Sequence, residues 1–334
     1  MTTSTVMKKV SIATVGTVFL SLAFISKAQA AALAPSFSNF YSVTDLGVIP
    51  NLPETYAGMT FKAGDPNILL IGGAANTLDA KIFAVTVMRD NNDRIIGFEP
   101  ASFFANAPGI NQGGVDASLA YSPKQDVLFY TSFDDNSIGQ IKQGSTNPDK
   151  QIDLNTLGIP PSTGGLNFVP KGFAGAGRLK FTSYNANLFY DTTIKPDGSG
   201  TYDINPPGKS IELSGGLDSF NYIKAGNPGF NQDSLLLLEY DAGKIAAYAI
   251  DDNGDPKPDT RQDFLTDIAN PIGSTIDPVT GDLLLSSQSL NQVFVIRGFR
   301  QPTSVPEPQA ISAASLAVLG LSLLLKKKVV SSSK

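Results

Sequence analysis

Oxygen-bearing side chains recur at two kinds of position in the middle of the chain, and their types could bind a ligand. One set follows closely on small residues that open a strand-like run: Asp116, Asn167, Asp218 and Asp277. The other set comes just after strongly apolar runs: Asp134, Asn185, Glu239, Asp241 and Gln288. Carboxylate and amide oxygens are the ligands that Ca²⁺ prefers. A fold that gathers these positions would create a binding site, with Asp116, Asp218 and Glu239 as candidate calcium ligands.

Each of these residues also has a structural interpretation, because Asp and Asn cap turns by accepting hydrogen bonds from nearby backbone N–H groups. The run Asp251-Asp252-Asn253-Gly254-Asp255 lacks the alternating spacing and the distal Glu of a calcium loop, so a hairpin turn is predicted there. Several tyrosines could line a sugar-binding surface, although packing between sheets is the favoured interpretation: Tyr41, Tyr56, Tyr121, Tyr184, Tyr222 and Tyr240.

The composition excludes several classes of chemistry. The 334-residue chain contains no His, Cys or Trp. A Ser-His-Asp triad, a His-ligated zinc centre, a thiolate nucleophile, a disulfide and an iron–sulfur cluster therefore cannot form. The net charge of -5 argues against a protein that tracks nucleic-acid phosphates.

The elements that must position these side chains are short strands. Between residues 40 and 299, Gly, Pro, Asn and Asp punctuate short apolar or alternating runs without helical periodicity, which predicts an all-β domain. A small residue, a short strand, a turn and a strongly apolar strand recur in that order, with openings at Gly58, Gly114, Gly164, Gly215 and Gly273. The spacing of roughly fifty residues is typical of four-stranded propeller blades. A β-sandwich or a β-helix is the alternative.

A propeller built from these units has five blades, with a sixth as the alternative if residues 89–112 form an irregular one. The last unit has three recognisable strands, and residues 41–46 are expected to supply its outer strand, which would join the two ends of the ring. In a propeller, the loops entering the innermost strands and those leaving the second strands meet at one face of the channel. That geometry would bring the two sets of polar side chains together.

The fourth and fifth units resemble blades of the gluconolactonase-like and NHL-type propellers. The resemblance lies in the run from Ala247 to Gly254, in Asp277-Pro278 and in Thr280-Gly281-Asp282. It covers about a third of the domain and implies a propeller fold. It also allows a calcium-dependent hydrolase or lactonase that uses carboxylates.

The first thirty residues have the three parts of a signal peptide: Lys8 and Lys9, the apolar run 10–25, and the small-residue sites Ala28 and Ala30. Cleavage by signal peptidase after Ala30 is predicted. An uncleaved membrane anchor is the alternative, but the apolar run is short for a bilayer core of about 30 Å.

The opposite end carries Val305, Pro306, Glu307 and Pro308, then an apolar stretch over 310–325 and a lysine cluster. These ordered features resemble the PEP-CTERM sorting signal. The resemblance implies recognition by an exosortase, processing near the motif and export linked to the envelope or to exopolysaccharide. A plain transmembrane tail anchor is the alternative. The predicted domains are a signal peptide (1–30), a secreted propeller (31–303) and a sorting segment (304–334).

Three functional hypotheses follow. The first is a non-catalytic propeller at the cell surface or in the extracellular matrix that binds polysaccharide or protein and needs no cofactor. The second is the calcium-dependent hydrolase or lactonase, which requires a metal cluster in the channel. The third is a structural matrix component without a discrete site. The first is the preferred prediction.

Overall fold

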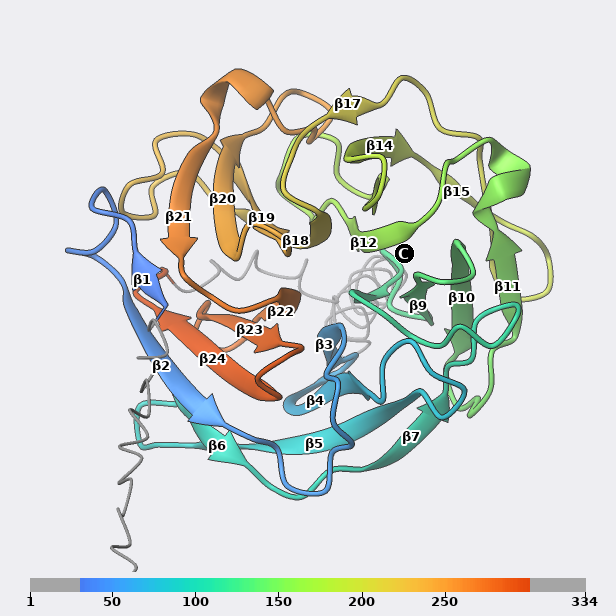
Figure 1. Cartoon of the computed structure of the whole chain (residues 1–334), viewed down its shortest axis with the longest axis horizontal. Coiled ribbons are helices and arrows are strands. Elements are labelled where there is room, and N and C mark those ends of the chain that lie inside the picture. Colours follow the sequence, from blue (N-terminus) through green and yellow to red (C-terminus); the bar gives the residue numbers. More distant parts are fainter. Residues whose placement is uncertain (1–30, 301–334) are drawn as a thin grey trace, which may run out of the picture.

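The computed structural model describes residues 31–300, and there the chain forms five large antiparallel sheets arranged as a ring, whose central axis we call the channel (Figure 1). The sheets are the blades of an all-β propeller, so the predicted fold class is confirmed and the sandwich and β-helix alternatives are wrong. The predicted signal peptide, sorting motif and helix 310–325 lie outside the described residues. Within the described residues no helix is long and apolar enough to cross a membrane.

Each blade is described from the channel outwards. The first contains β3 (Met59–Lys62), β4 (Asp65–Gly73), β5 (Lys81–Arg89), β6 (Ile95–Phe98) and β7 (Ser102–Asn106). The second contains β8 (Leu119–Tyr121), β9 (Val127–Ser132), β10 (Ser137–Lys142) and β11 (Lys150–Asp153). The third contains β12 (Thr163–Phe168), β13 (Leu179–Ser183), β14 (Leu188–Thr192) and β17 (Ile211–Glu212).

The fourth blade contains β18 (Leu217–Ile223), β19 (Ser234–Glu239), β20 (Lys244–Ala249), β21 (Gln262–Thr266) and, at its edge, β1 (Ala32–Leu33). The fifth contains β22 (Pro271–Ile276), β23 (Leu283–Ser287), β24 (Gln292–Arg297) and β2 (Ser42–Gly47). A separate hairpin, β15 (Ile194–Pro196) and β16 (Tyr202–Ile204), lies between β14 and β17 in sequence. Two 3₁₀ turns, η1 (Leu154–Leu157) and η2 (Pro258–Thr260), complete the described chain.

Residues 89–112 do not form a sixth blade. The segment supplies β6 and β7, and both strands pair with the nine-residue strand β5. Val87 of β5 pairs with Phe98 and Lys81 pairs with Asn106, so the two short strands together make one outer edge. The alternative of a sixth blade is therefore wrong, because this stretch completes the first blade.

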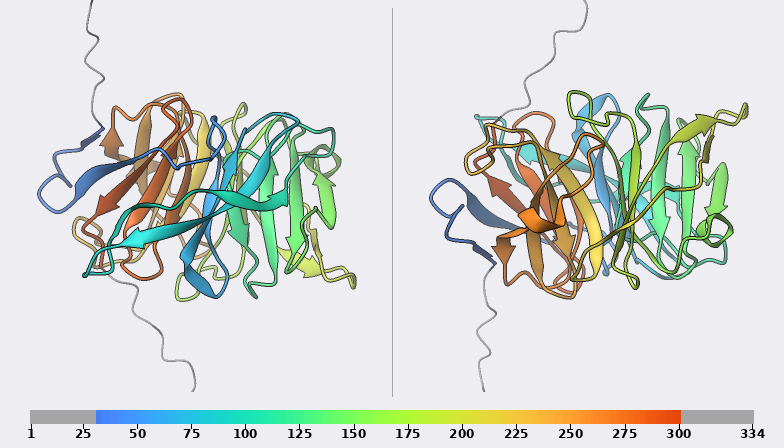
Figure 2. Two further views of the ribbon diagram at one scale, coloured as in Figure 1. Left: turned by 90° about the horizontal axis from the view of Figure 1, so that it is seen from below. Right: turned by 90° about the horizontal axis from the view of Figure 1, so that it is seen from above.

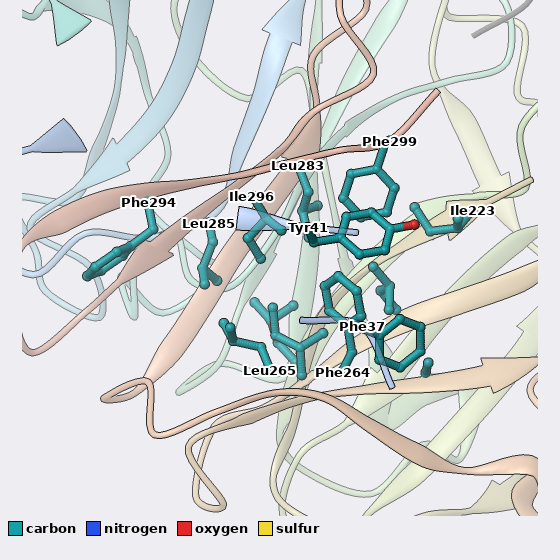
Figure 3. Close-up of a cluster of buried hydrophobic side chains, with 14 of the residues drawn as sticks. Phe37, Tyr41, Ile223, Phe264, Leu265, Leu283, Leu285, Phe294, Ile296 and Phe299 are labelled. Atoms are coloured by element: carbon teal, nitrogen blue, oxygen red, sulfur yellow. The ribbon is translucent and has the colours of Figure 1, made fainter. Parts of the chain in front are cut away.

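The ring closes through the N-terminal strand. β2 pairs antiparallel with β24 from Ser42↔Arg297 to Gly47↔Val293, which confirms the predicted outer strand of the last blade. The residues before β2 pack on the same side of the ring, where Phe37, Tyr41, Phe264 and Phe299 form a buried aromatic cluster (Figure 3). Closure thus joins distant parts of the chain by hydrogen bonds and by apolar burial.

The core lies between the blades, and the second strand of each blade is its centre. Every residue of β9, β19 and β23 is buried, as expected for runs such as Leu235-Leu236-Leu237-Leu238 packed on both faces. Five clusters of buried apolar side chains fill the spaces between neighbouring blades. The inner strands approach so closely that a Cβ on Gly165 would lie 2.2 Å from the carbonyl oxygen of Asp218 in the next blade.

Candidate functional site

Strand direction decides which side chains meet at each end of the channel. The second strands of the blades end where the inner strands begin, so the loops after β4, β9, β13, β19 and β23 lie at one end of the ring, seen from the side in Figure 2. We call the group of side chains at this end the channel mouth. Its members are Asn76, Asp116, Asp134, Tyr184, Asp218, Tyr240, Asp241 and Gln288.

Asp116 lies three residues before β8, and its side chain is almost wholly buried, with 3% of the residue exposed. Asn76, in the loop after β4, donates a hydrogen bond of 2.9 Å from Nδ2 to Oδ1 of Asp116. Burial raises the pKa of Asp116 to about 7, because a charged carboxylate loses its hydration there and the charge of Asp134 lies nearby. The Asn76 hydrogen bond acts in the opposite direction and favours the charged form.

Asp218 is the second residue of β18 and is even more buried, at 2% exposure. Its Oδ1 atom is buried and has no hydrogen-bond partner among the residues that the structure describes. Desolvation raises its pKa well above the ordinary value, and repulsion from Asp116 and Asp241 acts in the same direction. Two buried carboxyls from different blades therefore lie near one another at the mouth.

Two tyrosines complete the mouth. Tyr184 follows β13 directly and donates a hydrogen bond of 2.5 Å from its hydroxyl to Oδ1 of Asp241. Tyr240 follows β19 and donates one of 2.6 Å to Oε1 of Gln288. The two rings lie edge to face with centroids 5.9 Å apart. Burial raises the pKa of both hydroxyls, and the surrounding carboxylates raise them further, so both remain protonated donors at neutral pH.

Gly216 allows these groups to approach. Its backbone is left-handed, with φ of +71°, and a Cβ there would lie 2.7 Å from Oδ2 of Asp241 and 2.9 Å from Cε2 of Tyr184. Its carbonyl also accepts the backbone hydrogen bond of Tyr240. A glycine is therefore required for the chain to pass beneath Asp241 and Tyr184.

The mouth brings together five of the eight predicted ligand-binding residues: Asp116, Asp134, Asp218, Asp241 and Gln288. The exposed Asn185 donates from Nδ2 to Oγ of Ser162 instead. Asn167 lies at the opposite end of the channel because it is the fifth residue of β12, and its Nδ2 donates to the carbonyl of Phe220. Its predicted place beside Asp116 and Asp218 is wrong.

Glu239 does not reach the other carboxylates. It is 1% exposed, and both its oxygens accept from Arg261, at 2.9 Å from Nε and 2.6 Å from Nη2. Tyr248 donates a further bond of 3.2 Å to Oε1. The predicted calcium ligand set of Asp116, Asp218 and Glu239 is therefore not assembled. Among residues 31–300 no group of three acidic side chains could hold a metal ion.

Two other acidic residues from the sequence analysis, Asp277 and Asp251, have structural roles at the far end of the ring. Asp277 accepts two hydrogen bonds from Arg89, at 2.7 and 2.9 Å, and caps the turn at Val279. Asp251 accepts from the backbone N–H groups of Asn253 and Asp255, which confirms the predicted hairpin turn. Both carboxylates are occupied by contacts within the fold.

Some residues of the mouth were not expected to lie there. Asn76 is in a loop without a distinctive pattern. Tyr184 and Tyr240 were interpreted as packing between blades, whereas Tyr41, Tyr56 and Tyr222 are the ones that pack in that way. Asp135, next to Asp134, accepts backbone hydrogen bonds from Asn111 and Gly113 and so fixes the loop that leads to Asp116. The position of Tyr184 and Tyr240 directly after second strands is the signal that could have identified them.

The opposite end of the channel contains a neutral cavity of about 180 Å³. Its lining includes hydroxyl and amide side chains from each of the five inner strands: Thr60, Tyr121, Asn167, Asn221 and Thr275. Among the residues that the structure describes, no charged side chain lines it. The two ends of the channel thus differ in chemistry, with carboxylates at the mouth and neutral polar groups at the cavity.

No family model matches the sequence, and a search of curated proteins finds no match. Solved structures that resemble the chain include the holo form of the pyranose dehydrogenase PQQ domain from Coprinopsis cinerea, at 10% identity and a TM-score of 0.43, covering 80% of this chain and 97% of that one. An auxiliary nutrient binding protein from Bacteroides ovatus aligns at 10% identity and a TM-score of 0.42, covering 77% and 76%. The periplasmic gluconolactonase of Pseudomonas aeruginosa aligns at 13% and 0.43, covering 74% and 67%. At these identities and TM-scores, the similarity to these structures supports no conclusion about the activity of this chain.

Proposed function

We propose that the protein is a non-catalytic binding module that holds a polysaccharide at the channel mouth. The observation that supports the proposal is the convergence of Asp116, Asp218 and Asp241 with the rings of Tyr184 and Tyr240. Tyrosine offers a flat apolar ring with a polar tip, and carboxylates accept hydrogen bonds from sugar hydroxyls. The calcium-dependent hydrolase is not retained, because its three predicted ligands do not meet.

A polysaccharide fits this arrangement better than a protein partner. The mouth offers a compact set of polar groups around two rings, and the large exposed apolar side chains at this end of the ring, Leu78 and Leu290, come from the loops of two different blades. Protein interfaces usually have a larger buried apolar centre.

Retention of the purified chain on a panel of immobilised polysaccharides tests the proposal. The wild-type protein is expected to bind at least one member, and Tyr184→Ala or Tyr240→Ala is expected to weaken that binding by about tenfold, since stacking on one ring contributes roughly 1.5 kcal/mol. Tyr121→Ala, at the opposite end of the channel, is the matched control. Binding that survives both mouth variants, or that is lost only in the control, would overturn the proposal.

The proposal includes a place for this activity, at the cell surface or in the extracellular matrix. It is supported by the signal-peptide pattern up to Ala30 and by the PEP-CTERM-like run from Val305 to Pro308, which predict signal peptidase and an exosortase as processing enzymes. N-terminal sequencing and intact mass of the protein from its native host test this. A first residue of Ala31 and removal of the lysine-rich tail are expected, whereas an intact Met1 in the cytosol would contradict it.

A further inference from the structure

Within residues 31–300, neither the buried Asp116 and Asp218 nor the exposed Asp134 and Asp241 has a cation beside it, whereas the other buried acids of the fold do. Glu239 is paired with Arg261, Asp255 with Lys180, and Asp277 with Arg89. Asp282 lies 4.0 Å from Arg297. Asp116, Asp134, Asp218 and Asp241 belong to none of the ion pairs found in residues 31–300.

A second observation points to a missing donor. Buried polar atoms are nearly always hydrogen-bonded. A buried carboxylate without a partner loses its hydration, and no hydrogen bond within the protein offsets that cost in free energy. Oδ1 of Asp218 is such an atom within the described chain, in a residue that is 98% buried, and the charges that act on its carboxyl are those of Asp116 and Asp241. The Asp218 carboxyl therefore lies near two other carboxyls of the mouth, and no N–H donor of the described chain satisfies its Oδ1 atom.

We propose that the ligand held at the mouth carries a protonated amine, as an amino sugar with a free amino group does. This inference rests on the proposed polysaccharide function and specifies its chemistry. An ammonium group supplies the positive charge and up to three N–H donors. The rings of Tyr184 and Tyr240 also attract a cation through their π faces.

A metal ion fits the carboxyls of the mouth less well than an ammonium group does. A divalent ion needs several oxygens within 2.6 Å, and no three acidic side chains among residues 31–300 converge in that way. An amino sugar spreads its donors over a whole ring, so it can reach carboxyls that come from different blades. Its neighbouring hydroxyls can meet groups such as Gln288 and Asn76.

Calorimetric titration of the full chain with two probes tests this inference. The probes are a glucosamine tetramer, which has free amines, and the matching N-acetylglucosamine tetramer, which has none. The glucosamine tetramer is expected to bind about tenfold more tightly, because a charge-assisted hydrogen bond is replaced by a neutral one in the other probe. Asp218→Asn and the exposed Asp241→Asn are each expected to lower its affinity by about tenfold.

The control is Asp79→Asn, which removes one negative charge from the same end of the ring, at an exposed side chain outside the mouth. Its affinity for the glucosamine tetramer is expected to equal that of the wild type. Thermal unfolding of each variant confirms that it is folded, and Asp241→Asn keeps the test decisive even if Asp218→Asn fails to fold.

Equal affinity for the two tetramers, or an equal loss in Asp79→Asn, would overturn the amine inference and leave the proposed function standing. A lysine-containing peptide that binds more tightly than the glucosamine tetramer would overturn the sugar as the carrier of the amine. The polysaccharide panel decides the proposed function separately, because it includes neutral polymers.

Discussion

Asp116 and Asp218 are the residues whose surroundings conflict most with their chemistry. Both are acids whose side chains are almost completely buried from solvent, and this burial raises the pKa of each carboxyl. Their place beside the channel could be predicted from their distance to the small residues that open each unit. The pairing of Glu239 with Arg261 could not be predicted from the sequence, because it depends on the direction of the Glu239 side chain in the folded sheet and joins residues 22 positions apart.

The raised pKa of Asp116 predicts how stability depends on pH. The folded state binds a proton that the unfolded state has released between the ordinary pKa of 3.8 and about 7, so the free energy of unfolding falls as pH rises through this window. Asp116→Asn, which keeps the acceptor for Asn76, is expected to be more stable than the wild type by about 2–4 kcal/mol at about pH 8. At about pH 4 the two should be nearly equal.

Chemical unfolding of both proteins over this pH range measures the difference. Asp79→Asn serves as the control, since its carboxyl is exposed, and its unfolding curve should follow the wild type at every pH. A difference between Asp116→Asn and the wild type that does not change with pH would contradict the assigned burial of this charge.

At the scale of elements, the apolar runs of the second strands and the glycine openings could be read from the sequence because burial and close approach restrict residue type. The reason for the glycines is visible only in three dimensions. Gly165 donates from its N–H to the hydroxyl of Thr182, and that hydroxyl donates on to the carbonyl of Leu217 in the next blade. Gly273 and Ser286 repeat the arrangement towards Ala57.

Gly165→Ala tests this close packing of inner strands. The added methyl would overlap the backbone of Asp218 and Ser219, at 2.2 and 2.8 Å, and backbone in a sheet cannot move aside easily. We expect a loss of about 3 kcal/mol or more in the free energy of unfolding. Gly208→Ala, where nothing lies within 4 Å of the new carbon, should change it by less than about 0.5 kcal/mol.

A buried ion network joins the third and fourth blades and gives a second test at this scale. Lys180 on β13 is fully buried and contacts Asp191 of its own blade at 2.6 Å, together with Asp255 from the loop after β20. Lys180→Met leaves the carboxylate of Asp255 without its cation, whereas Asp191 keeps Arg178, and is expected to lower the free energy of unfolding by about 3–5 kcal/mol. Lys195→Met, which breaks an exposed contact of 3.7 Å, is expected to lower it by less than about 1 kcal/mol.

For the whole molecule, the number of blades and the mode of closure could be predicted because the repeat spacing and the missing outer strand are properties of the sequence. The completion of the first blade by β6 and β7 was harder to predict, since two short strands with an irregular link resemble a loop. The hairpin β15–β16 shows no repeat signal at all.

Removal of residues 31–47 tests the closure. The truncated chain loses β1 and β2, which exposes the edge of β24 and the aromatic cluster around Phe264. It is expected to unfold at a much lower denaturant concentration than the intact chain and to aggregate through the open edge. A truncated chain with an unchanged unfolding midpoint would show that the ring does not depend on its N-terminal strand.

The central claim is that ligand binding occurs at the mouth, and amide hydrogen exchange with and without a glucosamine tetramer tests it most directly. The account predicts slower exchange in the loops after β9, β13, β19 and β23, which include Asp134, Tyr184, Asp241 and Gln288. Slower exchange confined to the opposite end, around the cavity lined by Thr60 and Asn221, would contradict it.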